Sequence, residues 1–281
     1  MNRTLLFPAL AFGGGGLAYI LRFMQNRTGF ESSGLPIAGN LWAILLLAVL
    51  ALILAAALAL IGRIRAPKGE FICFEDAFFS FRTGFLLLLT AGIFLLAISG
   101  VLQIATNLGL LPDTVVLTAS GFRGRSLSTD TIGLISGGMT LLCAVCLFPT
   151  LSACRCSDSK DSDSADTSSD TLGVSLLIPV ITMVVQLVLR YRQDSVNPTL
   201  AAYYPSLLAL ILATMALYLL AGFAFQSGSS RAFVLWSTMA VVLCISALAD
   251  AQPLYSIFFY AGFSLTLAGY LCLHTGHLHM K

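Results

Sequence analysis

The chain carries eight long apolar stretches that contain no Asp, Glu, Lys, Arg or His residue. They cover residues 4–21, 39–61, 83–112, 131–154, 171–189, 195–230, 232–249 and 251–273. Each can supply about 18 or more residues of helix, and ~20 residues at a rise of ~1.5 Å cross the ~30 Å hydrocarbon core of a bilayer. We therefore predict an all-α fold, a polytopic transmembrane helical bundle of about eight spans.

The composition excludes a soluble protein. Of 281 residues, 58% are apolar and 10% are charged, whereas an ordinary soluble domain is roughly 25% charged. So little charge cannot cover the surface of a soluble chain of this length. Runs such as 44–61 do not alternate apolar and polar residues, which excludes an outer-membrane β-barrel. The basic residues are scattered among loops, so we expect the lipid bilayer and not nucleic acid as the partner.

The distribution of Lys and Arg predicts a plasma-membrane protein with both termini in the cytoplasm. With the N-terminus inside, nine basic residues lie in cytoplasmic segments and six lie outside, an excess that the positive-inside rule favours. The cytoplasmic set is Arg3, Arg63, Arg65, Lys68, Arg82, Arg155, Lys160, Arg231 and Lys281. The margin rests largely on the loop after the second span.

Two loops have a character of their own. Residues 152–171 are rich in Ser and Asp and contain no aromatic residue, so we expect a disordered acidic linker; a metal-binding or phosphorylated tail is the alternative. Near residues 70–82, phenylalanines recur at spacings of three and four, which predicts an amphipathic interfacial helix on the cytoplasmic face. We expect its aromatic stripe to face lipid or the protein itself, although a partner-docking surface would show the same stripe.

A weak similarity relates the two ends of the chain. The first span ends in Leu21-Arg22-Phe23 and the fifth in Leu189-Arg190-Tyr191, each followed by Gln-Asn or Gln-Asp and later by proline. Two parallel four-helix halves, 1–151 and 172–281, would explain this pattern, with the pseudo-twofold axis along the membrane normal. Chance likeness between Leu-rich helices is the alternative.

Four polar residues are candidates for substrate binding: Arg22, Gln186, Arg190 and Asp250. In a transporter they would line an outward-facing vestibule at the interface of the two halves. The alternative gives each a structural role. The arginines would then be interfacial anchors that reach water, and Asp250 would cap the helix that Pro253 begins.

The sequence contains no strong motif for catalysis, metal binding or cofactor binding. HExxH, GxSxG and GxxxxGK[ST] are absent, and no span carries a charge near its centre, so we predict no catalytic residues and no enzyme. Cys143-x-x-Cys146 and Cys154-x-Cys156 lack a nearby histidine, and the histidines cluster at residues 274–279; we expect neither a metal nor a cofactor. The glycines at 13–16 are expected to permit close helix packing, with a broken helix as the alternative.

Several segments resemble an uncharacterised bacterial family of multi-spanning membrane proteins. They include Leu189-Arg190-Tyr191-Arg192, residues 217–225, Ala247-Leu248-Ala249-Asp250 and Thr28-Gly29-Phe30-Glu31. The resemblance implies a bacterial inner membrane and gives no activity. Two functions stay open. The first is a non-catalytic accessory or scaffold subunit that packs with another membrane protein or a second copy of itself. The other is a permease-like transporter of an uncharged or amphipathic solute between the halves.

Overall fold

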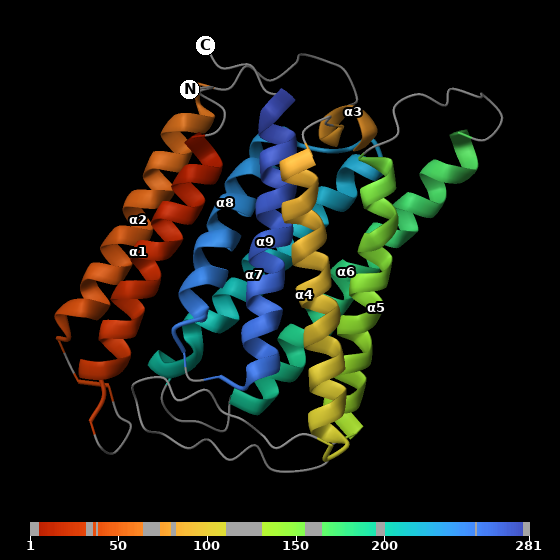
Figure 1. The fold of residues 1–281 in the computed structure, drawn as a ribbon. Helices are drawn as coiled ribbons and strands as arrows, with labels where there is room; N and C mark the ends of the chain where they lie inside the picture. Colours follow the sequence, from red (N-terminus) through yellow and green to blue (C-terminus); the bar gives the residue numbers. More distant parts are fainter. Residues whose placement is uncertain are drawn as a thin grey trace.

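A computed structural model of the chain shows nine helices in the residues that it describes (Figure 1). The described residues are 6–31, 36–37, 39–63, 74–79, 83–110, 131–154, 165–194, 200–250 and 252–277. The helices are α1 (Leu6–Thr28), α2 (Leu41–Ile61), α3 (Phe74–Phe78), α4 (Thr83–Asn107), α5 (Thr131–Ala153), α6 (Ala165–Asp194), α7 (Leu200–Ala224), α8 (Ser230–Ala247) and α9 (Leu254–His277).

Eight of these described helices, all except α3, are long and apolar enough to cross a membrane. The predicted all-α bundle of about eight spans is confirmed. Helices suit the hydrocarbon core because each one satisfies its own backbone hydrogen bonds. Proline is tolerated inside α5, α6 and α7, at Pro149, Pro179 and Pro205, because neighbouring helices and polar side chains compensate for the missing N–H in such bundles.

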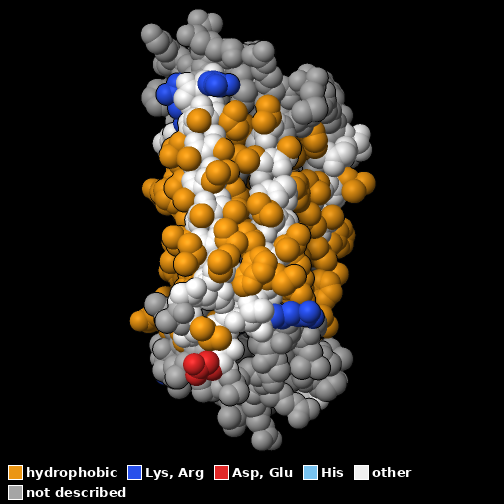
Figure 2. All heavy atoms as spheres, turned by 90° about the vertical axis from the view of Figure 1, so that its left-hand side faces the viewer, with side chains coloured by type: hydrophobic (Ala, Val, Ile, Leu, Met, Phe, Trp, Pro, Cys, Tyr) orange, Lys and Arg blue, Asp and Glu red, His pale blue; other side chains and the backbone are white. Residues whose placement is uncertain are grey.

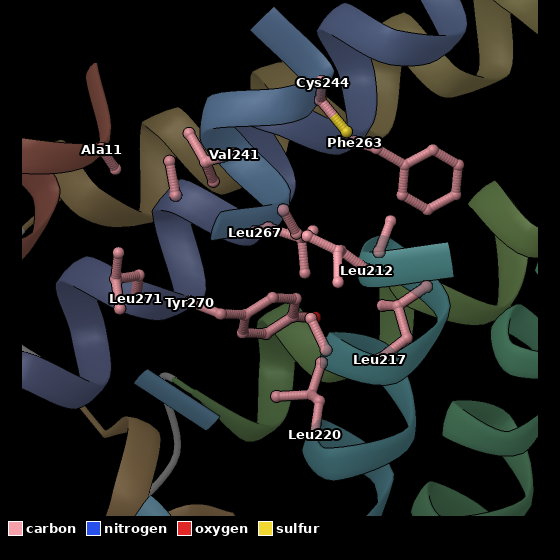
Figure 3. Close-up of a cluster of buried hydrophobic side chains, with 14 of the residues drawn as sticks. Ala11, Leu212, Leu217, Leu220, Val241, Cys244, Phe263, Leu267, Tyr270 and Leu271 are labelled. Atoms are coloured by element: carbon pink, nitrogen blue, oxygen red, sulfur yellow. The ribbon is translucent and has the colours of Figure 1, made fainter. Parts of the chain in front are cut away.

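Helices α8 and α9 form the centre of the bundle. The α1–α2 hairpin packs on α8, while α4 packs most extensively on α9 and then on α5 (Figure 1). Helix α7 lies between α6 and α8. Among the candidate spans, α8 and α9 are the most buried and α2 is the least. The core between them includes Leu217, Leu220, Val241, Phe263 and Tyr270, from α7, α8 and α9 (Figure 3).

Small residues allow α4 and α9 to approach closely. A Cβ atom added to Gly92 would lie 2.6 Å from the backbone nitrogen of Thr266, and one on Gly262 would lie 2.8 Å from Leu96 Cγ. On α1, a Cβ on Gly14 would meet Ile53 of α2, and one on Gly15 would meet Ile245 of α8. Helix α1 is continuous through residues 13–16, so the close-packing role is confirmed for Gly14 and Gly15 and the broken helix is wrong.

The spans run alternately up and down, so α1 begins and α9 ends at the same end of the bundle (Figure 1). The end of α1 and the junction between α8 and α9 lie together at the opposite end. Apolar side chains cover the middle of the face that α1 and α2 present, and charged side chains appear toward its two ends (Figure 2). This is the surface of a multi-pass membrane protein. The side that faces the cytoplasm stays a prediction.

The structure describes the middle of the predicted interfacial helix, and there it shows packing within the protein. Helix α3 covers five residues, and Phe74 and Phe78 are buried against other parts of the protein. Phe78 lies 5.3 Å from Phe223 and 5.7 Å from Tyr270, measured between ring centroids. For these two rings the structure agrees with the expected packing on the protein itself and not with a lipid-facing stripe. The other phenylalanines of the segment up to residue 82, apart from Phe79, lie outside the described residues.

The structure describes only part of the predicted linker. Helix α6 begins at Ala165, inside the segment 152–171, while residues 155–164 lie outside the described part of the chain. The extensive packing of α1 on α8 has no comparably extensive counterpart between α6 and α4, which a twofold axis would require. Helices from both 1–151 and 172–281 contribute residues to one hydrophobic core. The internal repeat stays a prediction.

Candidate functional site

The best-defined polar site lies where α1 ends beside the α8–α9 junction. Arg22 is completely buried, and its Nε atom donates to Asp250 Oδ1 at a distance of 2.6 Å. Its Nη1 atom donates to Gln25 Oε1 at 3.1 Å, and its guanidinium carbon lies 5.7 Å from the ring centroid of Tyr204. That distance permits a cation–π contact. The expectation that Arg22 is an anchor reaching water is wrong, because its charge is enclosed.

Asp250 receives both of its donors from α1. Asn26 Nδ2 lies 3.2 Å from the same Oδ1 atom and 3.0 Å from the carbonyl oxygen of Ala249. The predicted capping role is wrong, because α9 begins only at Leu254 and the carboxylate faces α1. One oxygen of Asp250 therefore joins Arg22 and Asn26 to the α8–α9 junction.

Arg190 approaches the same site from α6. Its Nη2 atom donates to Ser256 Oγ at 2.8 Å, at the start of α9, and its charge acts on Asp250. The structure therefore brings three of the four candidate residues, Arg22, Arg190 and Asp250, to one end of the bundle. Whether they bind a substrate stays a prediction.

Burial and the neighbouring polar groups have opposite effects on the pKa of Asp250. Asp250 lies outside the spans Ser230–Ala247 and Leu254–Gly276, yet it is only 6% exposed. Burial raises the pKa of Asp250 above its usual value, because the carboxylate loses its hydration; the charge and hydrogen bond of Arg22, the hydrogen bond of Asn26 and the charge of Arg190 act in the opposite direction. The loss of hydration is the largest effect.

Gln186, the fourth candidate, belongs to a separate cluster. Its Nε2 atom donates to Thr140 Oγ1 at 2.9 Å and to the carbonyl oxygen of Ser136 at 2.9 Å. The Ser136 hydroxyl donates to Gln186 Oε1 and accepts from Gln103 Nε2, each at 2.8 Å. This amide–hydroxyl cluster (Gln103, Ser136, Thr140 and Gln186) ties α4, α5 and α6 together. In the described part of the chain, Gln186 bonds to this cluster and not to Arg22 or Arg190.

The cysteine and histidine motifs lie apart from both clusters. Cys143 and Cys154 are buried free thiols, and burial raises the pKa of Cys154, which follows the end of α5, to about 12 because a thiolate would lose its hydration. His274 is buried among Phe78, Phe223 and Phe233, with Nδ1 at 3.2 Å from the carbonyl oxygen of Ala77. The described residues contain no group of three or more His, Cys, Asp or Glu side chains that could hold a metal ion.

Comparisons with known proteins do not place the chain in a family. No protein-family model matches the chain, and no curated protein or solved structure matches it significantly. The resemblance to a bacterial membrane family therefore stays a prediction from the sequence.

Sequence reasoning missed Gln25 and Asn26 as partners in the Arg22 site. A signal was present, because residues 22, 25 and 26 stand at spacings of three and four and share one face of a helix. The buried residues of α1 follow the same stripe through Ala11, Gly15 and Ala18. Extending that stripe to the end of the helix would have indicated that the polar face points into the protein.

Proposed function

We propose that the chain is a non-catalytic membrane protein, an accessory or scaffold subunit in a bacterial plasma membrane with both termini in the cytoplasm. The observation that carries this proposal is the burial of Arg22 and its 2.6 Å contact with Asp250. A side chain positioned to meet a solute would have to be reached by it, whereas Arg22 is covered completely by the protein. Its contacts serve to join helices.

The amide–hydroxyl cluster supports the same proposal. Gln186 and Ser136 exchange hydrogen bonds, and Gln103 completes the cluster. Hydrogen bonds between helices are a common means of fixing helix positions in a bilayer, where lipid supplies no partner. The polar groups of the described spans thus hold α4, α5 and α6 in one arrangement.

A scaffold subunit presents one apolar face to a partner and the others to lipid. Helices α2, α4 and α6 each expose large apolar side chains, including Leu47 at 68%, Leu87 at 68% and Ile181 at 54% exposed. These matched positions allow the partner face to be found. The partner is another membrane protein or a second copy of this chain.

The test is photo-crosslinking in native membranes with a crosslinking amino acid at Leu47, Leu87 or Ile181, one position at a time. We expect one position to give a discrete protein adduct and the others to give lipid adducts. The adduct should re-form when the chain and the captured protein are purified and reconstituted together. Lipid adducts at all three positions, with solute flux in proteoliposomes of the chain alone, would contradict the proposal.

The second candidate is a permease-like transporter of an uncharged or amphipathic solute. One observation favours it: Asp250 Oδ2 and Gln252 Oε1 are buried acceptors without a hydrogen-bond partner in the described part of the chain. Solute flux into proteoliposomes of the wild-type chain, abolished by Asp250→Asn, would support this candidate. Absence of flux with both the wild type and the variant would exclude it. A reporter fused at Lys281 tests the orientation; an extracytoplasmic reading would reverse it.

A further inference from the structure

The two oxygens of the Asp250 carboxyl group have different surroundings. Oδ1 accepts from Arg22 Nε at 2.6 Å and from Asn26 Nδ2 at 3.2 Å. Oδ2 is buried and has no hydrogen-bond partner among the described residues. A buried acceptor without a donor destabilises the folded state, and more so when it is charged.

A second buried acceptor without a donor lies close to Asp250 in the sequence. Gln252, two residues further along, donates through Nε2 to the carbonyl oxygen of Ala247, but its Oε1 is buried without a donor in the described structure. Protonation of a carboxylate converts one acceptor into a donor. One proton on Oδ2 therefore turns one of these two unpartnered acceptors into a donor and leaves both contacts of Oδ1 in place.

Arg22 has neutral partners that remain when Asp250 loses its charge. Gln25 Oε1 accepts from Nη1 at 3.1 Å, and the ring of Tyr204 lies 5.7 Å from the guanidinium carbon. The contact between Arg22 and Asp250 uses one nitrogen and one oxygen, whereas the strongest arginine–carboxylate pairs are bidentate. The geometry therefore tolerates a neutral carboxyl group beside this arginine.

We propose that Asp250 is a proton-binding site, in which Oδ2 takes up one proton from water while Oδ1 keeps its two donors from α1. The step forms one O–H bond and changes the charge of the Arg22–Asp250 pair from zero to plus one. Its effect falls on the contact that joins α1 to the α8–α9 junction. The site stands whether the chain is a scaffold or a transporter.

Two described arginines act on Asp250 from different helices. Arg22 of α1 and Arg190 of α6 favour the ionised carboxylate, as does the Asn26 hydrogen bond. Tyr204 of α7 lies against Arg22. Burial has the larger effect and raises the pKa of Asp250 above its usual value.

Infrared difference spectroscopy of the full chain in lipid bilayers tests the proposal across a pH series. The measured signal is the carbonyl stretch of an un-ionised carboxylic acid that exchanges slowly with D2O, because the group is buried. We expect this band to persist above the pH at which the exposed carboxylates ionise and to be lost in Asp250→Asn. Glu31→Gln, a change at an exposed carboxylate at the same end of α1, should leave the band unchanged.

A second variant keeps the proposal testable if Asp250→Asn does not fold. Asn26→Leu removes one donor from Oδ1 and so weakens the ionised form, which should shift the midpoint of the band to higher pH. A band that does not respond to either variant, or an Asp250 carboxyl that is ionised throughout the range in which exposed carboxylates titrate, would overturn the proposal.

Discussion

Arg22 Nε lies 2.6 Å from Asp250 Oδ1, although 228 positions separate the two residues in the sequence. The contact closes one end of the bundle, because it fixes the last turns of α1 to the α8–α9 junction. Gly14 and Gly15 bring the middle of the same helix against α2 and α8. Helix α1 is thus held both by close apolar packing and by a buried ionic contact.

Close packing between α4 and α9 predicts that Gly92→Ala destabilises the fold. The added methyl group would lie 2.6 Å from the Thr266 backbone nitrogen and 3.0 Å from the Gly262 carbonyl oxygen. Backbone atoms cannot rotate away, so we expect a loss of about 1–3 kcal/mol in the free energy of unfolding. Gly84→Ala on the same helix meets no atom within 4 Å and should be neutral or stabilising. Equal effects of the two changes in detergent unfolding would contradict the packing.

The aromatic contacts of α3 predict a structural role for Phe78. This completely buried ring packs on Phe223 and Phe233, so Phe78→Ala should lower the free energy of unfolding by about 3–5 kcal/mol. Phe94 is 58% exposed, and lipid or detergent replaces its environment at little cost. Phe94→Ala is therefore the control, and a comparable loss there would show that burial in the protein is not the cause.

The amide–hydroxyl cluster predicts that Gln186→Leu destabilises the chain by about 1–2 kcal/mol. The change removes both donor contacts to α5 and the acceptor for Ser136. Thr214→Val is the control, because its hydroxyl donates to Leu210 of its own helix. Unfolding in bilayers or micelles measures both. An unaltered stability of Gln186→Leu would mean that these contacts do not hold the helices.

The raised pKa of Asp250 predicts the direction of a pH effect on stability. Between the usual pKa and the raised pKa, the folded chain binds a proton that the unfolded chain has released. The free energy of unfolding therefore falls as the pH rises through this interval, and the stabilisation is complete below it. Asp250→Asn has no such group, so wild type should lose stability relative to the variant over this range. A relative gain of wild type with rising pH would have the wrong sign.

The spans were predictable because length and lack of charge are local properties of each segment. The environment of Phe74 and Phe78 was not, because periodicity shows that they share a face but not what covers it. Arg22 and Asp250 stand near helix ends in the sequence, where water is the usual neighbour. Their burial depends on the packing of α1 against α8, and only the stripe of residues 18, 22, 25 and 26 carried a local signal for it.

The separation of Gln186 from the arginines has a similar cause. Gln186 and Arg190 are four positions apart on α6 and were expected to share one vestibule. In the structure Arg190 donates to Ser256 of α9, whereas Gln186 bonds to Ser136 and Thr140 of α5. Sequence spacing placed both residues on one helix, and tertiary packing assigned them to different neighbours.

A double-mutant cycle on Arg22 and Asp250 tests the central claim most directly, namely that their contact ties α1 to the bundle. It is measured by unfolding at a pH at which Asp250 is ionised, with Arg27→Met, at an exposed arginine of the same helix, as the control. We predict that Arg22→Met and Asp250→Leu each cost about 3–5 kcal/mol, because each leaves a buried charge without its partner, and that the double variant costs less than either. Effects that simply add, or a loss for Arg22→Met no larger than for Arg27→Met, would contradict the account.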